Sequence, residues 1–108
     1  MNTSTSSILA VNEYKRRRNL KTALCFGHFS AIHPGHMKYF EYASKRAEKL
    51  IVLVKGDHFM QEFGSKNNGF TELERANSVA SINTVDQVLI QGHVEIAEAI
   101  RIIKPDVF

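Results

Sequence analysis

Apolar residues along this chain fall into two alternating patterns. Short, nearly continuous apolar runs are typical of strands that are buried on both faces of a sheet. Such runs predict three strands, at residues 23–27, 50–54 and 85–90. Elsewhere apolar residues recur every three or four positions, as in helices with one buried face. This spacing predicts helices at residues 35–47, from Thr71 onward, and at 94–103.

The helical spacing also predicts which side chains enter the core. The apolar positions expected to face the sheet are Met37, Phe40, Ala43 and Ala47, then Leu73, Ala76 and Val79, then Ile96, Ile100 and Ile103. A loop is expected over residues 55–70, and the Thr-x-x-Glu sequence at 71–74 predicts a capping box for the second helix. Residues 106–108, which follow Pro105, are expected to begin a fourth strand.

Alternating strands and helices of these lengths predict an α/β fold, because parallel strands are usually joined by a crossover helix. The expected architecture is a Rossmann-like α/β/α arrangement with a parallel sheet. The fourth strand would have too few residues to complete the edge of that sheet. The chain is therefore expected to be C-terminally incomplete, as a fragment or the leading domain of a longer enzyme.

The composition is that of one globular domain, since 108 residues with 44% hydrophobic and 23% charged positions suffice for a modest core. The net charge is +3, yet residues 1–21 alone hold five basic residues and one acidic residue. The rest, with nine basic and ten acidic residues, is nearly neutral. We expect a flexible basic segment at 1–20 and the domain at 21–108. A solvated charge run is favoured over a nucleic-acid-binding arm.

Two observations bear on the cellular location. The longest strongly apolar run, at residues 50–54, is much too short to cross a bilayer, and the run at 8–11 is too short for a secretory signal. Cys25 is the single cysteine and cannot form an internal disulfide. Both observations favour a cytoplasmic protein with no membrane partner.

The most informative stretch lies between the first strand and the first helix. There the strand ends in Gly-His-Phe-Ser at 27–30, and a His-Pro-Gly-His tetrad follows at 33–36. Two imidazoles three positions apart project from one side of the first helical turn. Free backbone N–H groups and the positive end of the helix dipole favour a phosphate at the same place. The tetrad therefore predicts a site for the phosphates of a nucleoside triphosphate.

This tetrad, with the Gly-x-Phe turn before it, resembles the nucleotidyltransferase superfamily with the H-x-G-H signature. Within it the chain is similar to cytidylyltransferase-like enzymes, such as glycerol-3-phosphate cytidylyltransferase and heptose-1-phosphate adenylyltransferase domains. The resemblance implies transfer of CMP or AMP from CTP or ATP, with Mg²⁺, to a small phosphorylated sugar, polyol or alcohol, releasing pyrophosphate. Relatives commonly form homodimers or are fused to a kinase or another biosynthetic domain, so both kinds of partner are expected.

The resemblance also implies roles for individual residues. His33 and His36 would be catalytic, donating hydrogen bonds to phosphate oxygens as negative charge builds. The nucleotide-binding residues of the turn would be Gly27, His28, Phe29, Ser30 and Gly35. Gly27 would let the backbone approach a phosphate, whereas Phe29 would pack inward and fix the turn.

Three later positions also match the family. Arg75 matches a catalytic arginine of the family, whose planar guanidinium binds phosphate oxygens with two donors. The alternative interpretation of Arg75 is an exposed helix residue that is paired with Glu72 or solvent. Lys66 matches a phosphate-binding loop lysine. Asp57 matches the aspartate after the second strand, which would bind the acceptor or cap the following turn.

Other interpretations of the histidines are open. The pair at 33 and 36 could cap or pack a helix end. Together with Cys25 and His28 it is also a closely spaced set of zinc-ligand types, but Cys25 lies in a predicted buried strand, which argues against a metal site. His58 and His93 match no motif and are interpreted as surface or capping residues.

Two departures from the family define the alternative function. Ser30 stands where relatives usually have an acidic or amide residue, so the group that they place beside the phosphates is changed. The Gly-Asp or Gly-His strand end and the Ser/Thr-rich helix start of relatives are also missing. The alternative function is therefore a non-catalytic nucleotide-binding module of a larger protein.

Overall fold

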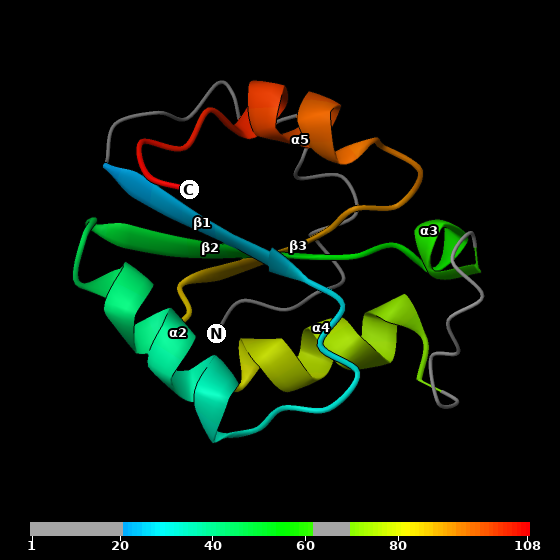
Figure 1. The fold of residues 1–108 in the computed structure, drawn as a ribbon, viewed down its shortest axis with the longest axis horizontal. Coiled ribbons are helices and arrows are strands. Elements are labelled where there is room, and N and C mark those ends of the chain that lie inside the picture. Colours follow the sequence, from blue (N-terminus) through cyan, green and yellow to red (C-terminus); the bar gives the residue numbers. More distant parts are fainter. Residues whose placement is uncertain (1–20, 62–69) are drawn as a thin grey trace.

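The computed structural model describes residues 21–61 and 70–108. The predicted basic segment at 1–20 and the predicted ligand Lys66 lie outside these described residues. The described part has an α/β fold with a parallel three-stranded sheet, which confirms the predicted class (Figure 1). The strands lie in the order β1 (Thr22–Gly27), β2 (Lys49–Val54) and β3 (Gln87–Ile90).

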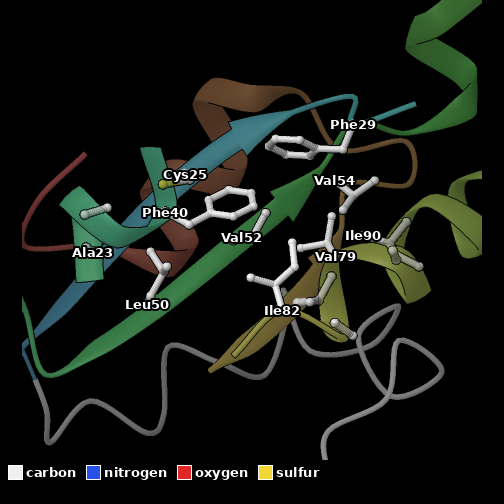
Figure 2. Packing of buried hydrophobic residues seen from close by; sticks show 14 residues of the cluster. Ala23, Cys25, Phe29, Phe40, Leu50, Val52, Val54, Val79, Ile82 and Ile90 are labelled. Carbon is white, nitrogen blue, oxygen red and sulfur yellow. The ribbon is translucent and has the colours of Figure 1, made fainter. Parts of the chain in front are cut away.

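Helices cover both faces of the sheet (Figure 1). Helices α2 (Pro34–Ser44) and α4 (Glu72–Ala80) pack on one face, and α5 (Ile96–Ile103) packs on the other. Alternate side chains of β2 point to opposite faces, so Val52 packs in the core beneath α2 and α4 (Figure 2) and Leu53 packs with α5. Burial on both faces explains the continuous apolar run of this strand.

The three strands end at the same level of the sheet. Their register sets Gly27 opposite Val54 and Val54 opposite Ile90. The short helix α3 (Asp57–Gln61) follows β2 beyond this end, as Figure 1 shows. Because the strands are parallel, the segments that leave all three meet at one edge, where ligands of such sheets bind.

Local sequence signals set the helix starts. Pro34 lies in the first turn of α2, as predicted, where a missing N–H loses no helical bond. The predicted capping box of α4 is confirmed. Thr71 Oγ1 accepts from the Glu74 N–H at 3.1 Å, and Glu74 Oε1 accepts from the Thr71 N–H at 2.9 Å.

Some predicted boundaries and core positions were wrong. Helix α2 ends at Ser44 rather than Ala47, and α3 lies inside the predicted loop. Strand β3 and helix α5 each begin two residues later than predicted, at Gln87 and Ile96. The side chains of Met37 and Leu73, predicted to be buried, are 45% and 37% exposed. Each precedes the first fully buried apolar residue of its helix, so helical spacing alone overestimated the length of the buried face.

The predicted fourth strand is represented by one bridge to β1. Val107 pairs in parallel with Ala23, and its carbonyl accepts from the Leu24 N–H at 2.9 Å. Asp106 Oδ2 accepts from the Thr22 N–H at 2.7 Å. Strand β1 therefore has hydrogen-bonded neighbours on both of its edges.

Candidate functional site

The turn between β1 and α2 is held by a buried aromatic ring. Phe29 has φ of 53°, a left-handed conformation that is uncommon for an aromatic residue. Its side chain is 4% exposed, and its ring centroid lies 5.4 Å from that of Phe40 and 5.2 Å from that of His36. This confirms that Phe29 packs inward. The same ring contacts connect the hydrophobic core to the second histidine of the tetrad.

Gly27, the last residue of β1, and Gly35, in the first turn of α2, each lie close to an aromatic or imidazole ring. A Cβ atom on Gly27 would lie 2.8 Å from Phe29 Cζ, and one on Gly35 would lie 2.9 Å from His33 Cε1. Contacts below 3.0 Å require the neighbour to move. The glycines therefore leave room for the two rings, a reason that the sequence did not reveal.

His33 and His36 form a capping box at the start of α2. His33 Nδ1 accepts from the Gly35 N–H at 3.1 Å, and His36 Nδ1 accepts from the His33 N–H at 3.2 Å. The two ring centroids lie 3.9 Å apart, with 31° between the ring planes. Because each Nδ1 is an acceptor, each neutral ring carries its proton on Nε2. The capping interpretation is therefore correct, and it leaves one N–H donor of each ring for a ligand.

The surroundings of His36 keep its ring neutral. Desolvation by burial lowers the pKa of His36 below its usual 6.5, and the neighbouring His33 and His28 lower it further. Protonation of Nδ1 would also break the hydrogen bond from the His33 N–H. The turn thus presents His36 as a neutral donor at neutral pH.

Arg75 reaches this turn from α4. Its side chain is fully buried, so the alternative of an exposed helix arginine was wrong. Its Nη1 donates to the His28 carbonyl at 2.8 Å, and its Nη2 donates to Asp57 Oδ1 at 2.6 Å. One guanidinium therefore joins the segments that follow β1 and β2.

Asp57 is bound on both sides of its carboxylate. Besides Arg75, it accepts through Oδ2 from the Glu72 N–H at 3.0 Å, and Glu72 Oε1 accepts from the Asp57 N–H at 2.9 Å. Asp57 thus caps the N-terminus of α4, a helix distant in sequence. No sequence signal predicts Glu72 as a partner of Asp57, because the pairing depends on how the two segments pack.

The remaining predicted residues lie in different surroundings. The His28 side chain is exposed, and Ser30 is partly buried. An open depression of about 460 Å³ lies beside the tetrad, lined by Ile32, His33, Pro34, Met37 and Lys38. His33 and the exposed Met37 both lie on its surface.

The zinc interpretation has little support from the surroundings of Cys25. That side chain is buried in β1, and burial raises the pKa of its thiol, which disfavours a thiolate ligand. Within residues 21–61 and 70–108, no three His, Cys, Asp or Glu side chains gather to hold a metal ion.

Comparison with known proteins shows which family the chain belongs to. The sequence profile of the family described as Cytidylyltransferase-like matches residues 24–108. This chain belongs to that family. Membership confirms the resemblance to the cytidylyltransferase-like family that the tetrad predicted.

Two relatives illustrate the range of the family. The domain is 34% identical over 93 residues to the bifunctional protein HldE of Paramagnetospirillum magneticum, covering 85% of this chain and 19% of HldE. It is 32% identical over 88 residues to the FAD synthase of Methanohalobium evestigatum, covering 82% of this chain and 57% of that protein. The chain therefore spans less than two thirds of the length of either relative.

A solved structure supports the fold. The lipopolysaccharide core biosynthesis protein from Thermoplasma volcanium matches the cytidylyltransferase-like domain with a TM-score of 0.74 and 24% identity, over 82% of this chain and 71% of that one.

None of the described helices has the length and apolar character needed to cross a bilayer.

Proposed function

We propose that this cytidylyltransferase-like domain transfers CMP or AMP from a nucleoside triphosphate to a small phosphorylated sugar, polyol or alcohol, with release of pyrophosphate. The observation that carries the proposal is the paired geometry of His33 and His36. Their Nδ1 atoms are held by backbone N–H groups, which leaves two Nε2 donors at the N-terminus of α2. Such donors suit the oxygens of a triphosphate.

The reaction needs little from the protein beyond position and charge. A phosphate monoester is mostly dianionic at neutral pH, so its oxygen attacks the α-phosphorus without a general base. The bond between the α-phosphorus and the bridging oxygen then breaks, and pyrophosphate leaves with that electron pair. His33 and His36 would donate hydrogen bonds to the oxygens on which the charge develops.

Magnesium would accompany the triphosphate. The ion would be held by the nucleotide rather than by these side chains. Imidazole nitrogens suit Mg²⁺ poorly, and the Asp57 carboxylate is already bound to Arg75 and Glu72. Phosphate oxygens and water would therefore supply the ligands of the ion. When bound, the ion neutralises charge on the leaving pyrophosphate.

Other assignments are part of the same proposal. Gly27, His28, Phe29, Ser30 and Gly35 would form the nucleotide-binding turn, and contact of Arg75 or Lys66 with a phosphate stays a prediction from the resemblance. A cytoplasmic location, a homodimer and a fused kinase or other biosynthetic domain also stay predictions. The second candidate function, a nucleotide-binding module without catalysis, is favoured by Ser30, which brings no charge to the phosphates.

The proposal is tested first by thermal unfolding with MgCTP, MgATP or neither. Ligand at a hundredfold its dissociation constant should stabilise the fold by about 2.7 kcal/mol. We expect one nucleotide to raise the unfolding temperature, and His36→Ala to abolish that shift. Arg101→Gln, which changes an exposed cation of α5 on the other face, is the matched control and should keep it.

Pyrophosphate release then separates the two candidate functions. Turnover with a phosphate monoester and the stabilising nucleotide supports the transferase. Nucleotide binding without any pyrophosphate, across a panel of monoesters, supports the non-catalytic module. If neither nucleotide shifts the unfolding temperature, the phosphate site itself is refuted for this chain.

A further inference from the structure

A second pair of imidazoles lies at the same edge of the sheet. The rings of His58 and His93 are stacked, with centroids 4.6 Å apart and 16° between their planes. Both residues are exposed. His58 lies in α3, just after β2, and His93 follows β3 before α5 begins. The pair therefore bridges the carboxyl ends of two neighbouring strands, while the tetrad follows the third.

The two segments that carry this pair, the start of α3 and the loop after β3, are fixed to each other. The Gly56 N–H donates to Gln91 Oε1 at 3.0 Å, and Gln91 is 3% exposed. Gly56 also lies so close to the neighbouring loop that a Cβ on it would be 2.2 Å from the Gly92 carbonyl oxygen. Gly92 has φ of +62°, which favours glycine. The stack is thus supported by buried backbone contacts and does not depend on the rings alone.

We propose that His58 and His93 bind the phosphate of the acceptor monoester. Stacked rings keep their nitrogens at the rim of the stack, and an imidazole carries at least one N–H donor in either charge state. Two rings from different segments of the chain can each donate to a different oxygen of one phosphate. This inference rests on the proposed function, which requires a second phosphate at the edge where the triphosphate binds.

Other charged groups at this edge agree with the assignment. Asp57 precedes His58 and would repel an anion, but its carboxylate is compensated by Arg75 and by the Glu72 N–H. The Arg75 guanidinium is itself fully buried and bound to Asp57 and the His28 carbonyl. Unlike the buried Arg75, both rings of the stacked pair are exposed, so their N–H donors are open to a ligand.

The test is a titration of the chain with inorganic phosphate, followed through the imidazole C2–H resonances by NMR. We expect the resonances of His58 and His93 to move together with one dissociation constant. Replacing either by glutamine should raise that constant about tenfold, read from the remaining histidine. Arg101→Gln, which changes an exposed residue of α5 on the other face of the sheet, should leave that constant unchanged.

Three results would overturn the inference. The first is that the two resonances stay fixed while phosphate moves those of His33 and His36. The second is that MgCTP or MgATP competes with phosphate at the stacked pair, which would make it part of the nucleotide site. The third is that ZnCl2 moves the pair and phosphate does not. Failure of the nucleotide to stabilise the chain would instead refute the proposed function.

Discussion

Arg75 Nη2 lies 2.6 Å from Asp57 Oδ1, and this ion pair joins the start of α4 to the carboxyl end of β2. The guanidinium also holds the His28 carbonyl at 2.8 Å, so the pair fixes the turn that carries the histidine tetrad. Burial removes a cation from water at a cost in free energy, and the attraction of a counter-charge offsets that cost. A buried cation that loses its partner is therefore destabilising. Stability and the geometry of the site should therefore depend on the same contact.

Asp57→Ala should lower the free energy of unfolding by about 2 kcal/mol, because it leaves the buried Arg75 without a counter-charge. The Asp57 side chain is 38% exposed, so the loss should be smaller than for a fully buried pair. Denaturation in urea measures the loss. The exposed pair of Glu98 and Arg101 provides the control, since Glu98→Gln should cost less than about 1 kcal/mol. Equal losses of unfolding free energy in the two variants would show that the pair of Arg75 and Asp57 stabilises the fold no more than an exposed pair does.

The lowered pKa of His36 predicts a dependence of stability on pH. In the unfolded chain this group titrates near its usual 6.5, and in the folded chain it titrates lower, so the unfolded state binds more protons on acidification. The contribution of His36 is present above pH 6.5 and is lost as the pH falls through its folded pKa. An NMR titration of the His36 C2–H should give a midpoint below 6.5, and a midpoint at or above that value would contradict the assignment.

Gly27→Ala should destabilise the chain by about 2 kcal/mol, because the new Cβ would force the Phe29 ring to move. A double-mutant cycle with Phe29→Leu isolates this effect, since the smaller side chain relieves the collision. The alanine should therefore cost less in the Phe29→Leu background. A cost that is the same in both backgrounds would mean that the ring is not the obstacle.

Thr71→Ala should cost about 1 kcal/mol, because the hydroxyl accepts a free N–H of the first turn of α4. Ser78→Ala, on an exposed position of the same helix, is the control and should be neutral or slightly stabilising. Thermal unfolding of the two variants decides the point. A loss at Ser78 as large as that at Thr71 would refute the capping explanation.

Local patterns were enough to predict the elements that build the site. The apolar run of β2 reflects burial on both faces, and Pro34 and the Thr71 capping box locate two helix starts. Each of these signals involves residues within a few positions of one another, so the sequence displays them directly. Phe29 was also predicted to pack inward and fix the turn, and its side chain is 4% exposed.

Contacts between distant segments could not be predicted in the same way. Arg75 is 47 residues from His28 and 18 from Asp57, and no periodicity connects these positions. The reciprocal bonds of Asp57 and Glu72, like the stacking of His58 on His93, exist only because parallel strands bring their carboxyl ends to one edge. The strand order predicts that these segments meet at the carboxyl ends of the strands. Which side chains contact each other there depends on how they pack.

The ordered rings of His33 and His36 have a kinetic and entropic consequence for any ligand. Two backbone N–H groups already restrict the torsions of both side chains when α2 forms. The loss of rotamer freedom is therefore part of folding, and an incoming anion does not have to order these rings. The affinity of this turn for an anion should therefore change little when side-chain motion increases with temperature. Binding should also require no rearrangement at the start of α2.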